Sequence, residues 1–193
     1  MRRSLSVAGL ASLLAACATH PPPLAGAVYG GKLAVRSEAS ASQAARSVNG
    51  QFELSGSPAS GQLVLTSPIG TTVARARWSH PAGAQGEPSE IELEADGRTA
   101  RFDSLDAMMQ QALGDSLPLA AMFDWLAGRP WPAASATRAP DGSSFEQLGW
   151  HVDLSQFASA QLIVADRPAP QPALHVRVKL DAAEPAASAA SAS

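Results

Sequence analysis

Apolar and polar residues alternate along much of the chain between residues 30 and 180. In the clearest run, from Glu90 to Ala95, three apolar residues on one side alternate with glutamates on the other. Successive side chains of a strand point to opposite faces, so this period of two predicts strands with one apolar and one wet face. Asp96-Gly97 follows the run and predicts a two-residue hairpin turn, because both positions tolerate a positive φ. Further alternating runs lie at 33–35, 48–54, 63–65, 72–78, 150–154 and 174–180.

The run from 72 to 78 has small residues and a tryptophan on one side and two arginines on the other. Its alternation predicts a shared apolar face for Thr72, Ala74, Ala76 and Trp78, opposite Val73, Arg75 and Arg77. Short strands of this kind, with turn signals between them, favour an antiparallel sheet that is wet on one face.

The period changes to a helical one between residues 103 and 128. Asp103 or Ser104 is a candidate N-cap and Gly114 a stop signal for a first short helix. Its apolar residues recur at helical spacing: Leu105, Met108, Met109, Ala112 and Leu113. Pro118 opens a second short helix that ends before Gly128, with one apolar side: Leu119, Met122, Phe123 and Leu126. An antiparallel sheet with helices on one face is an α+β fold.

A curved sheet covered by helices either buries a solid core or encloses an apolar cavity. The large residues that would meet there are Met108, Met109, Met122, Phe123 and Trp125 from the helices and Phe52, Leu65, Trp78 and Trp150 from the sheet. Methionine repacks around varied shapes and suits an adaptable pocket. Such stripes are more often plain core, however, and composition leaves both interpretations open.

The first seventeen residues have the pattern of a bacterial lipoprotein signal. Arg2 and Arg3 precede a short apolar segment that ends in Leu14-Ala15-Ala16-Cys17, and Cys17 is the only cysteine in the chain. A membrane-spanning helix needs roughly 20 apolar residues, more than the stretch from Leu5 to Ala16 offers. An ordinary signal peptide would leave the single cysteine unexplained. We therefore predict cleavage before Cys17 and acylation of its thiol. Ala18 is not the Asp that signals inner-membrane retention, which favours the outer membrane.

The signal and the composition of the rest divide the chain into four parts. We expect a signal peptide at 1–16, a Pro- and Ala-rich spacer at 17–28, one folded domain at 29–181 and a disordered Ala/Ser tail at 182–193. Removing the signal peptide leaves 177 residues and takes away both of its arginines, so the formal charge moves from −3 to −5. A mildly acidic chain without basic clusters gives no reason to expect nucleic-acid binding.

Ser67-Pro68-Ile69-Gly70 is an unusual turn between two alternating runs. Proline followed two residues later by glycine is favourable turn chemistry. It places Ile69, a large apolar residue, at an exposed tip. Such a side chain either folds back onto the sheet, stands as one of the scattered exposed apolar residues that need no explanation, or enters a bilayer or a partner.

A set of short motifs, in this order and spacing behind the lipoprotein signal, resembles the outer-membrane lipoprotein LolB family. The resemblance covers about Tyr29 to Leu180. The motifs are Tyr29–Val35, Leu63–Gly70, Asp103–Met109, Gly114–Leu119, Trp125–Pro130 and Glu146–Val152.

The resemblance implies an open antiparallel β half-barrel with a short helical lid over a hydrophobic cavity. It implies an acceptor without enzymatic activity or cofactor, anchored in the outer membrane and facing the periplasm. This acceptor takes lipoproteins from the periplasmic carrier LolA, holds their acyl chains and inserts them into the membrane. We expect it to act as a monomer and to contact outer-membrane lipid.

The resemblance also assigns residues to these roles. Pro68, Ile69 and Gly70 form the membrane-insertion loop, in which Ile69 stands where the family more often has leucine. For the acyl-chain cavity, the expected lining residues are Phe52, Leu65, Trp78, Leu93, Met108, Met122, Trp125 and Trp150.

Two other classes of protein compete with this interpretation. An enzyme is disfavoured because the chain has no Gly-x-Ser-x-Gly elbow, His-Glu-x-x-His helix or Gly-rich phosphate loop. Its four histidines are scattered without ligand or triad spacing, His151 and His175 occupy polar sides of predicted strands, and no metal site is expected. A scaffold lipoprotein of the same fold fits the sequence equally well, but it would not need an exposed Ile69 or an empty cavity.

Overall fold

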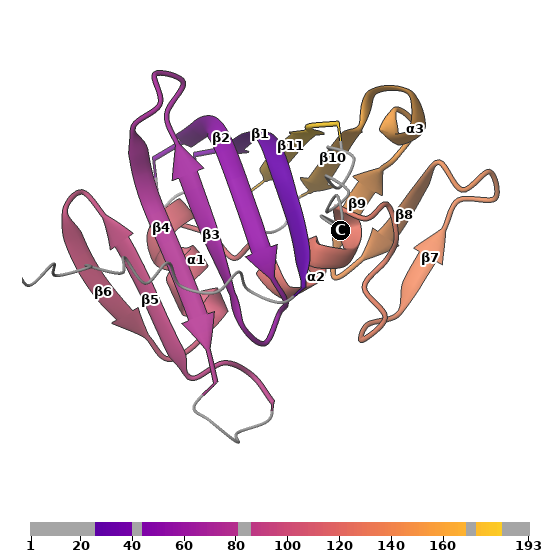
Figure 1. Cartoon of the computed structure of the whole chain (residues 1–193). Coiled ribbons are helices and arrows are strands. Elements are labelled where there is room, and N and C mark those ends of the chain that lie inside the picture. The colour runs from indigo at the N-terminus through magenta and orange to yellow at the C-terminus, as the bar shows by residue number, and fades with distance from the viewer. Residues whose placement is uncertain (1–25, 40–43, 81–85, 169–172, 183–193) are drawn as a thin grey trace, which may run out of the picture.

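One curved antiparallel sheet and three short helices make up the fold in the computed structural model (Figure 1). The structure describes residues 26–39, 44–80, 86–168 and 173–182. The strands are β1 (Ala27–Ser37), β2 (Arg46–Gly56), β3 (Gly61–Thr66), β4 (Thr72–Ser79), β5 (Glu90–Ala95), β6 (Arg98–Phe102), β7 (Ala136–Arg138), β8 (Ser144–Gln147), β9 (Trp150–Asp153), β10 (Leu162–Arg167) and β11 (Leu174–Leu180). The helices are α1 (Leu105–Leu113), α2 (Leu119–Trp125) and α3 (Phe157–Ala160).

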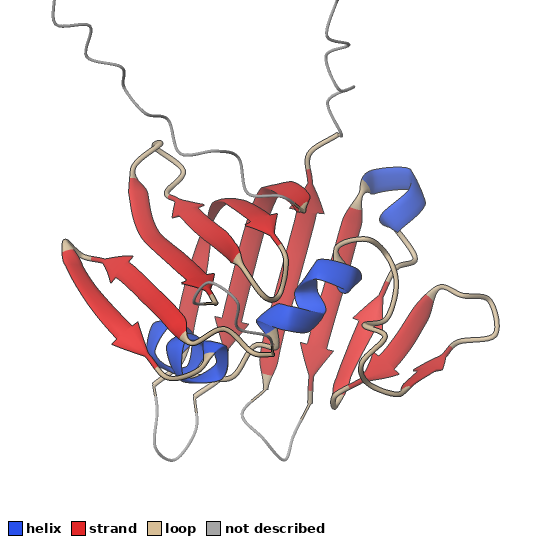
Figure 2. Ribbon diagram, turned by 60° about the horizontal axis from the view of Figure 1, so that its bottom comes forward, coloured by secondary structure: helices blue, strands red, loops and turns tan. Residues whose placement is uncertain are grey.

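The sheet is open. Its strand order is β6-β5-β4-β3-β2-β1-β11-β10-β9-β8-β7, so within the described residues β6 and β7 are the two edges. Figure 2 shows the sheet curving around α1 and α2, which lie against its inner face. This arrangement confirms the predicted open antiparallel sheet with helices on one face. The predicted boundaries of the folded domain stay a prediction, although β1 already begins at Ala27.

The alternation of the sequence corresponds to the two faces of the sheet. In β11, Leu174, Val176, Val178 and Leu180 are buried, and the three residues between them are exposed. Across the neighbouring strand, Val35 lies opposite Val176. The inner face is thus continuous from strand to strand, because antiparallel pairing in this register keeps apolar residues on one side.

A β-bulge in β4 changes one predicted orientation. Thr72 lies opposite Thr66 and Ala74 lies opposite Leu65, so Val73 is an extra residue without an opposite partner. Two residues of a bulged strand then oppose one residue of its neighbour. Thr72 is therefore exposed on the outer face beside Val73, and the prediction that it shares a face with Ala74 was wrong.

The predicted hairpin turn between β5 and β6 is confirmed. Asp96 has φ of 52° and Gly97 has φ of 70°. Two successive residues of positive φ are the requirement of a type I′ turn, whose twist matches that of the flanking strands.

Both predicted helices form: α1 lies between its predicted caps, and α2 begins after Pro118 but ends at Trp125, one residue short of the predicted Leu126. Ser104 is the N-cap of α1, its hydroxyl oxygen accepts a hydrogen bond from the Ala107 amide at 3.0 Å, and Gly114 ends the helix at φ of 76°. Helix α2 follows Pro118 and has five buried residues: Leu119, Ala121, Met122, Phe123 and Trp125. Neither these helices nor any other in the described part of the chain is long and apolar enough to cross a membrane.

Several short elements have no clear sequence signal. All three residues of β7 are exposed, and β6 is exposed except for its last residue. A strand that buries neither face carries no alternation. In β10 the first two residues, Leu162 and Ile163, are both buried, so its apolar residues run together instead of alternating. The four-residue helix α3 has no buried residue that would give it a helical pattern.

We expect Ser104→Ala to lower the free energy of unfolding by about 1 kcal/mol, because an N-cap hydroxyl satisfies an amide at the start of the helix. Ser104→Asp is the control, since a carboxylate at this position also caps. Urea unfolding followed by circular dichroism measures the shift. Equal destabilisation by Asp and by Ala would contradict the capping role.

Candidate functional site

The loop between β3 and β4 is a tight turn fixed by hydrogen bonds. The Gly70 amide donates to the Ser67 carbonyl at 2.9 Å, and the Ser67 amide donates to the Thr71 carbonyl at 2.8 Å. The Ser67 hydroxyl oxygen also accepts from the Thr71 amide at 3.2 Å. Serine first, proline second and glycine last, here with φ of 87°, is the sequence that such a turn favours. The tip is therefore held in one conformation.

Ile69 lies at the apex of this turn and is 90% exposed. Figure 1 shows the β3–β4 hairpin projecting from the top of the sheet. Among the large apolar residues that the structure describes as exposed, the others are Val28, Val73 and Leu148, at 66%, 41% and 47%. The predicted exposure of Ile69 at a tip is confirmed, and Pro68 and Gly70 beside it are exposed as well.

The eight residues predicted to line an acyl-chain cavity all come together between the sheet and the helices. Phe52, Trp78, Met108, Met122, Trp125 and Trp150 belong to one buried cluster, and Leu65 and Leu93 pack against it partly buried. Sequence reasoning placed Phe123 there too but did not single out Phe145 or Val152, which are 2% and 0% exposed. Val152 belongs to the predicted alternating run at 150–154 but was not assigned to the cavity, whereas the four-residue strand of Phe145 gave no pattern of its own.

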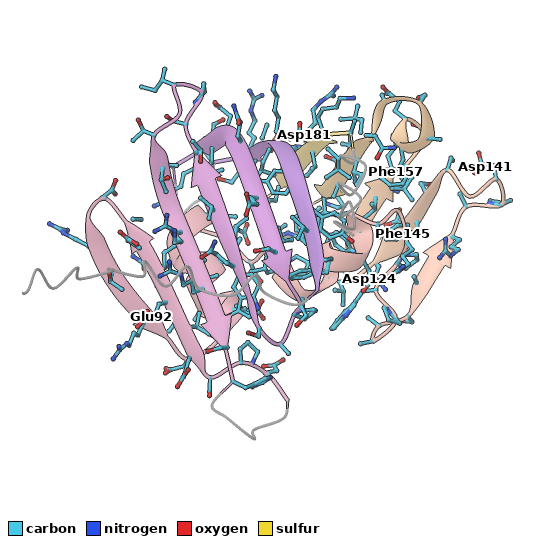
Figure 3. All side chains as sticks on the ribbon, in the orientation of Figure 1. Glu92, Asp124, Asp141, Phe145, Phe157 and Asp181 are labelled. Atoms are coloured by element: carbon cyan, nitrogen blue, oxygen red, sulfur yellow. The ribbon has the colours of Figure 1, made fainter. Side chains whose placement is uncertain are left out.

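Aromatic rings fill the space around α2. Trp125 makes edge-to-face contacts with Phe145 at 6.2 Å and with Trp150 at 5.9 Å between ring centroids. On the other side of α2, Phe123 makes the same kind of contact with Trp78 at 6.2 Å. Figure 3 shows Phe145 close to α2, among these side chains, whereas Glu92 lies at the opposite, outer side of the sheet. Helix α2 thus joins two halves of the inner face through large side chains.

The side chain of Gln147 holds the segment that follows α2. Its amide oxygen accepts from Trp125 Nε1 at 2.8 Å and from the Trp131 amide at 2.9 Å. Its amide nitrogen donates to the carbonyls of Trp131 and Ala134, both at 2.8 Å. The side chain is 2% exposed and uses its full hydrogen-bonding capacity. Sequence reasoning quoted Gln147 only as part of a motif, because a buried glutamine has no signal of its own.

A buried ion pair holds the loop between α1 and α2. Arg167 Nη2 in β10 donates to Asp115 Oδ2, and Arg167 Nη1 donates to the Ser116 carbonyl at 3.0 Å. The guanidinium also lies over the ring of Trp150, 5.4 Å from its centroid. Asp115 is 9% and Arg167 is 6% exposed. The pair thus lies at one side of the apolar cluster, and the two buried charges compensate each other.

Tyr29 in β1 connects the sheet to helix α2, which covers its inner face. Its hydroxyl donates to the Phe123 carbonyl at 3.0 Å. Burial raises the pKa of Tyr29 above its ordinary value, Arg129 lowers this pKa and Asp124 raises it further. The phenol is therefore protonated at neutral pH and able to donate.

Polar residues of the outer face form surface pairs. His151 Nδ1 lies 2.6 Å from Glu146 Oε1, and His175 Nδ1 lies 2.6 Å from Asp166 Oδ1. A hollow of about 1340 Å³ is lined by residues of β1 to β6 and their loops, most of them polar, together with Trp78, Ile91 and Phe102. In the described residues, no group of three or more His, Cys, Asp or Glu side chains is placed to hold a metal ion.

Comparison with known proteins places the chain. The family profile described as "Outer membrane lipoprotein LolB" matches residues 28–181. The chain belongs to the LolB family. It is 33% identical to the outer-membrane lipoprotein LolB of Bordetella petrii, over 95% of this chain and 93% of that protein. It is 31% identical to the LolB of Thiobacillus denitrificans, over 82% and 86%, and 28% identical to that of Chromobacterium violaceum, over 79% and 82%.

Membership of the LolB family confirms the class of protein that the sequence predicted. Proteins of this family are outer-membrane lipoproteins that accept lipoproteins from LolA, and they are not enzymes. The exposed Ile69 tip and the helix-covered apolar cluster are the two features of this LolB-family chain that suit such a role. The predicted lipidation residue, Cys17, lies outside the described residues.

We expect Gln147→Leu to lower the free energy of unfolding by more than about 2 kcal/mol. The groups that Gln147 binds would stay buried without a hydrogen-bond partner, and each such group costs about 1–3 kcal/mol. The same substitution at the exposed Gln111 of α1 is the control and should change stability by no more than about 0.5 kcal/mol. Urea unfolding of both variants measures the difference. A similar effect at both positions would show that Gln147 has no special bracing role.

We expect Arg167→Met to cost about 3–5 kcal/mol of stability, since it leaves the Asp115 carboxylate buried without its partner. Adding Asp115→Leu to the same chain should recover a large part of this loss, and the double-mutant cycle gives the coupling energy. Additive effects of the two substitutions would contradict a coupled pair.

Proposed function

We propose that this protein is anchored by lipid at Cys17, holds the acyl chains of incoming lipoproteins between its helices and sheet, and delivers them to the bilayer through the Ile69 loop. The observation that carries the proposal is Ile69 itself, which is 90% exposed on a hydrogen-bonded tip. A large apolar side chain gains nothing in water at this place. It gains free energy when the tip meets lipid or an acyl chain.

The acyl-chain site in this proposal is the cluster formed by Phe52, Leu65, Trp78, Leu93, Met108, Met122, Trp125 and Trp150. These side chains now pack against one another, so an acyl chain would have to displace α1 and α2 from the sheet. Both helices are short, with nine and seven residues. They meet the sheet mainly through side chains, and methionines repack readily around a guest of variable shape.

The direction of transfer follows from affinity alone. Each methylene group that passes through water costs roughly 0.8 kcal/mol, so direct passage from the LolA cavity to this cluster avoids most of the barrier. Cargo moves towards the protein that binds its acyl chains more tightly. Release into the bilayer then removes them from the equilibrium, and no nucleotide or other cofactor is required.

Anchoring at Cys17 would keep the acceptor at its destination. Several acyl chains on one residue give durable attachment, because each methylene group buried in the bilayer contributes free energy. We expect the protein to work as a monomer, since each step uses features of a single chain.

We expect Ile69→Glu to lower incorporation of cargo into vesicles at least about tenfold, because a buried isoleucine contributes about 1.5–3 kcal/mol and a charge at the tip opposes insertion. Transfer of cargo from LolA should remain, since the apolar cluster is unchanged. The assay gives LolA loaded with a lipoprotein to the lipidated protein in phospholipid vesicles and follows cargo by flotation.

Ile69→Leu is the conservative control and should keep full activity. Val28→Glu is the control for a new charge on an exposed valine elsewhere, and it should also be active. Full incorporation by Ile69→Glu would instead favour the scaffold interpretation, in which the tip has no role.

A further inference from the structure

Val73 is a second exposed apolar residue close behind the Ile69 tip. It is 41% exposed and lies at the second position of β4, four residues after Ile69. Valine is a good strand former, but on the solvent-facing side of a sheet its partly exposed side chain contributes little burial of apolar surface. On the same strand, the outward position Arg77 is charged and exposed. Val73 therefore departs from the character of the outer face.

Val73 faces outward, as alternation back from Trp78 requires, and the β-bulge turns its neighbour Thr72 to the same side. Because Val73 is the unpaired residue between Thr72 and Ala74, the inner-face residues beyond it keep their register with β3. Bulges re-aim side chains and increase the local twist of the strand. Here the bulge brings Thr72 to the outer face beside Val73 and leaves the core residues Ala76 and Trp78 in place, at 3% and 1% exposure.

The part of the β3–β4 hairpin that surrounds these residues, from Gly61 to Ala74, carries no charge. From Leu54 to Ala74 the sequence has no Asp, Glu, Lys or Arg, and the residues nearest the tip are serine and threonine. Charged groups make insertion into lipid costly, whereas hydroxyl groups are tolerated at the interface. The first charged residue beyond the tip is Arg75, whose Nη1 lies 3.6 Å from Glu94 Oε2. An uncharged tip followed by an arginine is the order of groups expected across a lipid interface.

The surface that this tip meets is set by the anchor. Cys17 is separated from Gly26 by nine residues, which span at most about 30 Å when extended. The register places Ala27 opposite Gly56 and thus beside Gly61, at the far end of β3 from the tip. Six residues of strand and two strand spacings separate the tip from Ala27, a distance of about 20–25 Å. The tether is therefore long enough for the tip to touch the membrane that holds Cys17.

We propose that Val73 is a second membrane-contacting residue on the outer face just behind the tip, so that the β3–β4 hairpin meets the phospholipid bilayer at two points, Ile69 and Val73. This inference rests on the proposed function, in which the Ile69 loop inserts into lipid. Two contacts on a rigid hairpin fix the angle at which the sheet approaches the membrane, which one contact does not.

The first test measures depth with a fluorescent probe. Because Cys17 is the only cysteine and is consumed by lipidation, Ile69→Cys, Val73→Cys or Arg77→Cys each adds a single free thiol for an environment-sensitive dye. The lipidated full-length variants are placed in vesicles of phosphatidylethanolamine and phosphatidylglycerol. We expect a blue shift and quenching by spin-labelled lipid at 69 and 73, and neither at 77, which lies about 13 Å further along the strand.

The outcomes of this test separate the inference from the proposed function. A dye that is quenched at 69 but not at 73 overturns the role of Val73 and leaves the Ile69 tip standing. A dye that is quenched at neither position overturns both. Quenching at 69, 73 and 77 alike would show that the face lies flat on the lipid, which also overturns a two-point contact.

The second test measures function. We expect Val73→Asp to lower incorporation of cargo into vesicles about tenfold, and Val73→Thr, which keeps the shape of the side chain and the strand, to lower it several-fold. Transfer from LolA should stay unchanged, and Val28→Thr serves as the control at a distant exposed valine. Wild-type incorporation by both Val73 variants, with both folded by circular dichroism, would overturn the proposal.

Discussion

An apolar face that the sheet cannot cover by itself is the constraint on which the structure depends. The strand order ends at β6 and β7 without closing, so the inner face must be shielded by something other than strands. The sequence provides two short helices and fills the remaining space with large side chains, three of them tryptophans with 0–2% exposure. A cover made of side chains can be rearranged without breaking a backbone ladder. This property is what an acceptor of acyl chains needs.

The cover is attached differently at its two ends. Near β8 and β10, the attachments are polar and specific: Gln147 binds the segment after α2, and Arg167 binds the loop before it. Near β5 and β6, α1 presents Met108 and Met109, which are buried by apolar contact. Polar contacts with fixed geometry resist sliding, whereas methionine contacts adapt. The fold therefore combines a fixed side with an adaptable side around one apolar cluster.

The sequence predicted the elements that bury one side, because their apolar residues recur with a regular period. It did not predict elements and contacts that depend on full exposure, full burial or partners remote in sequence. Alternation located the strands from β1 to β5, β9 and β11, and the signals at Ser104, Gly114 and Pro118 located α1 and the start of α2, because these signals are local. It missed β7, which buries nothing, and β10, whose first residues are buried together. Thr72 was placed on the wrong face because a bulge is invisible to a strict period of two. Gln147 and Arg167 act through partners remote in sequence, so their roles needed the fold.

In the proposed function, the Ile69 tip and the apolar cluster handle lipid in opposite ways. The cluster buries its apolar surface and can yield, whereas the tip leaves its apolar surface in water and is held rigid by three hydrogen bonds at Ser67. A rigid tip loses little conformational entropy when it meets the bilayer, so most of the gain from burying Ile69 remains as binding free energy. A flexible tip would lose part of this gain and would fold back onto the sheet to hide its isoleucine. In the proposed function, the hydrogen bonds of the turn therefore keep Ile69 exposed and available to lipid.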